Sequence, residues 1–140
     1  MNFLKILKKD VKEATPQVPN EIADIQTKYE VLVSEINKLI KDGLLILQKD
    51  SYYLALNKIA NDNGVKESSI WVDYYMGRVS ATSILLGRLL RIMGEDTNIL
   101  NEIVLSEKNR AIDDINRCQN IMELLNKDNN KKKENNGKSE

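Results

Sequence analysis

Residues 71–93 read WVDYYMGRVSATSILLGRLLRIM, and apolar side chains recur along them in alternating steps of four and three residues. Two other segments have the same rhythm. A mean spacing of 3.5 residues draws one apolar stripe along an α-helix, and such a stripe must be buried against other helices. The pattern therefore predicts an all-α fold. The three stripes are Val72-Met76-Val79-Ser83-Leu86-Leu90-Met93, Ile22-Ile25-Tyr29-Leu32-Ile36-Leu39 and Ala111-Ile115-Cys118-Met122-Leu125, with Ser83 as the one polar interruption.

Capping and turn residues divide this pattern into helices. Asn20 follows two prolines as a candidate N-cap, Asp50-Ser51 looks like a second cap, and Asn63-Gly64 and Gly94 look like stops. We therefore expect an antiparallel bundle of about four helices. Their expected ranges are residues 20–47, 51–63, 67–93 and 97–126.

The composition along the chain divides it into three parts. Residues 1–18 form a basic amphipathic appendage, which we expect to be a short helix. Residues 19–126 form the bundle. Residues 127–140 contain no apolar side chain, so they cannot offset the entropy cost of ordering, and we expect a disordered charged tail.

The charged residues and the histidine count narrow the classes of function. The 140 residues include 21 basic and 21 acidic side chains but no histidine, which removes Ser-His-Asp triads and histidine metal sites. Cys118 is the single cysteine, so an internal disulfide is impossible. The glycines form no phosphate-binding loop. We expect a protein that is not an enzyme and needs no cofactor or metal.

The hydropathy of the chain indicates where in the cell the protein is expected. No segment approaches the roughly 20 apolar residues of a membrane span, and the lysine-interrupted N-terminus does not resemble a secretory signal. We expect a cytoplasmic protein without a membrane partner.

A second apolar stripe lies beside the first in the segment 67–93. A helix that is apolar on so much of its surface is central in its bundle or faces a partner. We therefore expect this flank to bind a second copy of the chain, another protein, or both. The candidate interface residues are Trp71, Tyr75, Leu85 and Leu89.

Residues 55–94 also resemble the helix-turn-helix of phage-repressor-type DNA-binding domains. The residues that carry this resemblance are Ile59, Ala60, Gly64, Val65 and Ile70, because such a motif needs a small residue, a tight turn and packed apolar residues between its helices. The resemblance implies a regulator that binds duplex DNA. Its DNA-contacting residues would be Lys66, Ser68, Ser69, Trp71 and Arg78.

Residues 39–56 are similar to the start of some phage terminase small subunits, which are helical DNA-packaging adaptors. Two functions therefore stay open, namely an interaction module and a DNA-binding protein. A recognition helix of the repressor type ends near Gly77, so an unbroken helix across residues 76–82 would favour the interaction module.

Overall fold

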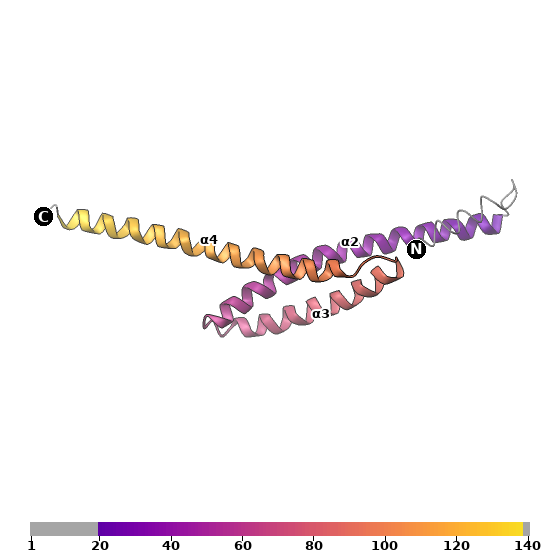
Figure 1. Cartoon of the computed structure of the whole chain (residues 1–140), viewed down its shortest axis with the longest axis horizontal. Helices are drawn as coiled ribbons and strands as arrows, with labels where there is room; N and C mark the ends of the chain where they lie inside the picture. Colours follow the sequence, from indigo (N-terminus) through magenta and orange to yellow (C-terminus); the bar gives the residue numbers. More distant parts are fainter. Residues whose placement is uncertain (1–19, 139–140) are drawn as a thin grey trace.

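The computed structural model describes residues 20–138, which form three long α-helices (Figure 1). These are α2 (Asn20–Asp62), α3 (Ser68–Ile92) and α4 (Asn98–Gly137). The all-α prediction is confirmed, and the described part of the chain contains no strand. The expected helix within residues 1–18 lies outside the described residues.

Helix α2 is the central element, because α3 and α4 both pack along it and touch each other little. Helix α3 returns antiparallel to α2, which brings Gly43 against Leu86 and Asp50 against Arg78. Helix α4 then runs in the same general direction as α2 and crosses it (Figure 1). The arrangement therefore departs from a closed antiparallel bundle of four helices.

The two turns between helices use glycine as the sequence indicates. Gly64, with φ of 92°, follows the end of α2, and Gly94, with φ of 70°, follows the end of α3. Both values lie in the left-handed region that glycine adopts without a steric cost. The stops predicted at these positions are present.

A small apolar core lies where the helices meet. Leu47 of α2 and Leu86 of α3 are completely buried, and Leu90 and Leu100 complete the cluster. A Cβ atom on Gly43 would lie 2.6 Å from Leu86 Cδ2, so this glycine permits the close approach of α2 and α3. The partly buried residues around this core are Ile40, Leu44, Val79, Ile103 and Val104.

The predicted break between residues 47 and 51 is wrong, because α2 passes through it without interruption. Asp50 and Ser51 are both buried at the contacts with neighbouring helices and do not cap a helix end. The carboxylate of Asp50 instead accepts a hydrogen bond from Arg78 of α3. Residues common at N-caps can equally satisfy a partner on another helix, and a single sequence does not distinguish the two uses.

The predicted helix end at residue 126 is also wrong, since α4 continues to Gly137 through most of the expected disordered tail. Adding residues to an existing helix avoids the cost of nucleation, so a polar segment can extend it without packing. All the described residues from 127 onward are exposed. The prediction that this segment adds nothing to the core therefore agrees with the structure, although its expected disorder does not.

Two helical segments extend beyond the core in opposite directions (Figure 1). We call residues 20–39 of α2 the α2 arm and residues 115–137 of α4 the α4 arm. At 1.5 Å per residue the arms are about 30 Å and about 35 Å long. Most of each arm extends beyond the end of α3, so the side chains of both arms are largely exposed.

Candidate partner-binding surface

The four residues predicted as a partner interface all lie on α3 but separate into two pairs. Trp71 and Tyr75 lie near the turn between α2 and α3, with ring centroids 6.3 Å apart. Leu85 and Leu89 lie further along α3, about 15 Å away at the rise of an α-helix. Trp71 and Leu85 are more than half exposed, while Tyr75 and Leu89 are half-buried.

Trp71 and Tyr75 belong to an aromatic cluster that joins α2 to α3. The rings of Tyr53 and Tyr75 stack across the two helices with centroids 5.5 Å apart. The rings of Trp71 and Tyr74 meet edge to face at 5.8 Å. Such pairs add about 0.5–1.5 kcal/mol beyond the area that they bury. The contributions of Tyr52 and Tyr53 from α2 were missed by sequence reasoning, although the adjacent tyrosines were a visible signal.

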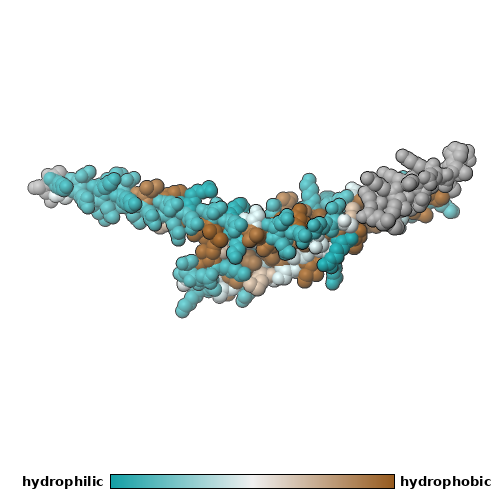
Figure 2. Space-filling model, viewed as in Figure 1, coloured by the Kyte–Doolittle hydropathy of each residue, from teal (hydrophilic) through white to brown (hydrophobic). Residues whose placement is uncertain are grey.

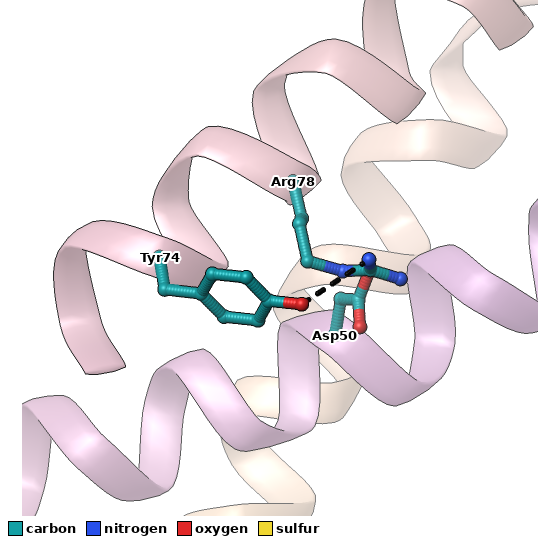
Figure 3. A network of polar contacts seen from close by, with 3 residues as sticks. All are labelled: Asp50, Tyr74 and Arg78. Carbon is teal, nitrogen blue, oxygen red and sulfur yellow. Dashed lines mark hydrogen bonds and ion pairs between the residues drawn. The ribbon is translucent and has the colours of Figure 1, made fainter. Parts of the chain in front are cut away.

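An ion pair between a buried carboxylate and a partly exposed guanidinium lies in the same region (Figure 3). The side chain of Arg78 donates from Nε to Oδ2 of Asp50 at 2.8 Å, and its Nη1 lies 3.4 Å from the hydroxyl of Tyr74. The Asp50 side chain is 3% exposed, whereas that of Arg78 is 44% exposed. The hydrogen bond to Asp50 raises the pKa of Arg78 above its usual value. Arg78 therefore neutralises a carboxylate that would otherwise be buried alone.

A second polar network joins α2 to α4. The hydroxyl of Tyr52 donates to Oδ2 of Asp114 at 2.7 Å, and the guanidinium of Arg110 lies 4.1 Å from the centroid of the Tyr52 ring. Arg110 also pairs with Glu107 of its own helix at 2.6 Å. The hydrogen bond to Asp114 raises the pKa of the Tyr52 phenol. On this face of α4, Glu107 therefore pairs with Arg110, and both Arg110 and Asp114 contact Tyr52 of α2.

The residues predicted to contact DNA are only partly available. Lys66 lies in the turn before α3, and Ser69 and Trp71 are exposed in its first turn. Ser68 is buried, and Arg78 is occupied by Asp50. Helix α3 continues unbroken through Gly77 to Ile92. The structure therefore does not present these residues together on a short recognition helix.

Exposed apolar side chains also lie on the two arms. On the α4 arm, Met122 is 64% exposed, and a brown patch interrupts the hydrophilic surface of this arm in Figure 2. Ile121 lies beside the stripe and widens the patch, whereas Leu124 lies further round the helix. The exposed apolar residues are Ile121, Met122, Leu124 and Leu125 on the α4 arm and Ile22, Ile25, Val31, Leu32 and Leu39 on the α2 arm.

The surface also contains a small cavity between α2 and α4, with a volume of about 230 Å³. Leu54, Val104 and Ile112 line it, and the buried Oγ of Ser51 at its edge has no hydrogen-bond partner among the described residues. Within residues 20–138, no cluster of three or more cysteine or acidic side chains is placed to hold a metal ion. No described helix has the length and apolar content needed to cross a membrane.

No protein-family model, curated protein or solved structure matches this chain.

Proposed function

We propose that this protein is a non-enzymatic helical assembly module that self-associates through the apolar side chains exposed on its long helices. The observation that carries the proposal is the exposed apolar stripe on each arm. On the α4 arm the stripe begins inside the fold, at the fully buried Ala111, and continues to the exposed Met122 and Leu125. A stripe buried at one end and exposed at the other indicates that a partner covers the rest.

The energetics of isolated helices support the same proposal. A helix in a protein gains most of its stability by packing its apolar face against other helices. Its intrinsic helix propensity alone gives only marginal stability. Met122 and Leu125 are 64% and 57% exposed, so complete burial would give each more than half of the about 1.5–3 kcal/mol that a fully exposed side chain gains. A second helix laid against an arm supplies that burial.

The flank of α3 adds anchor residues of the kind that dominate protein interfaces. Trp71 is half exposed, yet its ring is held by Tyr74 and Tyr75. Aromatic side chains that are already ordered lose little conformational entropy when a partner covers them. We propose that this flank is a second contact area, for the same partner or for another protein.

Binding to duplex DNA is the alternative function, and the geometry of α3 does not favour it. A recognition helix must present several polar or basic side chains to one groove. Here Arg78 is paired with Asp50 and Ser68 is buried. The unbroken α3 supports the interaction module over a recognition helix of the repressor type.

Sedimentation equilibrium tests the proposal directly. Measured from about 1 µM to about 100 µM, where moderate dimer affinities fall, the mass should rise above the 16.0 kDa of one chain. The variant Met122→Glu/Leu125→Glu should weaken association. Its matched control, Asn116→Glu/Asn120→Glu, adds the same charge to the opposite face of the same arm and should not.

Two results would overturn the proposal. One is a mass of a single chain at every concentration. The other is salt-sensitive binding of duplex DNA fragments at low ionic strength by a monomeric protein, since electrostatic attachment is strongest under those conditions. The second result would favour the alternative function.

A further inference from the structure

We propose that the partner is a second copy of this chain, placed so that the α2 arm of each copy packs antiparallel along the α4 arm of the other. The inference rests on the proposed self-association and specifies which surfaces meet. It predicts a closed dimer with two-fold symmetry in which both arms of both copies are covered.

The placement of the arms is the first argument. The α2 arm and the α4 arm leave the core at opposite ends (Figure 1). A two-fold axis that passes beside the core, perpendicular to the long axis, exchanges the two ends. The rotation therefore brings the α2 arm of one copy beside the α4 arm of the other, and their similar lengths let the two overlap along most of each arm. Because the contact is made twice, the assembly closes.

The apolar pattern of the arms is the second argument. Ile22, Ile25, Leu32 and Leu39 of the α2 arm occupy positions of a heptad repeat, and all four are exposed. On the α4 arm, Met122 and Leu125 continue the same kind of repeat. Helices with this spacing pack side by side with interlocking side chains. The repeat ends at Leu125, so only polar residues of the α4 arm extend beyond it.

Charge decides which arms pair. The α2 arm has four acidic and two basic residues, whereas the α4 arm has three acidic and five basic residues. The acidic end of the α2 arm, at Glu21 and Asp24, would lie towards the lysine-rich end of the partner's α4 arm at residues 131–133. Pairing two α2 arms or two α4 arms would place like charges together, which disfavours those arrangements.

Disulfide crosslinking gives a direct test, because Cys118 is the only cysteine and is exposed on the α4 arm. Cys118 lies near the core end of the α4 arm, so in the proposed antiparallel pair it would lie opposite the core end of the partner's α2 arm. New cysteines at apolar positions near that end are introduced one at a time as Leu32→Cys, Ile36→Cys and Leu39→Cys. After mild oxidation, at least one variant should convert most of the protein to a covalent dimer. Peptide mapping should show the new cysteine joined to Cys118 of the other chain.

Two controls separate a specific contact from random oxidation. Ser34→Cys places a thiol on the opposite face of the α2 arm and should leave the protein non-crosslinked. Each stripe variant combined with Cys118→Ser should also lose its crosslink. Wild-type protein should not form disulfide dimers through Cys118 alone.

Each remaining outcome would contradict the inference. A Cys118–Cys118 dimer would show that two α4 arms pair, and a bond between two new cysteines would show that two α2 arms pair. A ladder of trimers and larger species would indicate head-to-tail chains. An oligomer that forms no crosslink would place the contact elsewhere. A protein that is monomeric throughout would also remove the proposed function, which distinguishes the two failures.

Discussion

Tyr52 shows how one hydroxyl group connects two helices, because it donates to Asp114 of α4 while its ring lies under Arg110. We predict that Tyr52→Phe lowers the free energy of unfolding near neutral pH by about 0.5–1 kcal/mol, the usual net value of such a hydrogen bond. Tyr53→Phe, which keeps the ring stacked on Tyr75, is the control. Urea titrations of both variants measure the effect.

The same residue predicts a pH dependence. The pKa of Tyr52 is raised in the folded protein by its hydrogen bond to Asp114. The contribution of this neutral phenol is therefore complete below the unfolded pKa of about 10 and is lost as the pH rises through the higher folded value. The stability difference between wild type and Tyr52→Phe should shrink above about pH 10. A constant difference at all pH values would contradict this assignment.

The pair of Asp50 and Arg78 leads to a second prediction at the residue scale. Removing the guanidinium by Arg78→Met leaves a carboxylate that is 3% exposed without its partner. We expect a clear loss of stability, because a buried charge without compensation is costly. The double variant Asp50→Asn/Arg78→Met removes the charge as well and should recover most of the loss. Thermal unfolding of the three proteins checks this order, and a double variant less stable than Arg78→Met would contradict it.

Two glycines in the helices give opposite predictions. At Gly43 an alanine Cβ would meet Leu86 Cδ2 at 2.6 Å and Cγ at 3.2 Å, and this leucine is fully buried. The strain, about 1–3 kcal/mol, should exceed the gain in helix propensity of about 1 kcal/mol. At Gly77 nothing lies within 4 Å. Gly77→Ala should therefore stabilise the protein by about 1 kcal/mol while Gly43→Ala destabilises it, as denaturant unfolding will show.

At the scale of elements, local patterns predicted most of the fold. The stripes through Leu32, Leu86 and Met122 lie on the three helices, and the turns at Gly64 and Gly94 occur where expected. The information missing from the sequence was tertiary. Nothing local shows that Asp50 pairs with Arg78 of another helix, so its pattern resembles a helix cap.

The candidate surface was predicted less completely than the helices, for a related reason. Periodicity shows which residues share a face, but it does not show where a neighbouring helix ends. Ile121 and Leu124 are exposed because α4 extends beyond the core. Trp71 was found because it lies on the second stripe of its helix. Tyr53, which stacks on Tyr75, comes from a different helix, so its place in the cluster required the fold to be known.

The α4 arm gives a prediction at the same scale. Ending the chain after Asn126 removes a segment in which every described residue is exposed. The free energy of unfolding of the monomer should change by less than about 0.5 kcal/mol, because no packed contact is lost. The circular dichroism signal of helix should fall. A large loss of stability in dilute protein would show that the segment packs against residues that the present contacts do not include.

At the scale of the whole molecule, association and folding must be linked if two copies cover each other's arms. The dimer then gains about 1.4 kcal/mol per tenfold rise in protein concentration, so the unfolding midpoint should rise with concentration. The opposite net charges of the paired arms add an electrostatic contribution to the free energy of dimer formation, and salt screens this contribution. The concentration dependence should therefore persist at high salt with a weaker dimer, because the apolar contacts remain. If the unfolding midpoint does not depend on concentration while the core still unfolds cooperatively, Met122, Leu125 and the α2 arm are exposed in the free protein. The partner would then have to be a different chain.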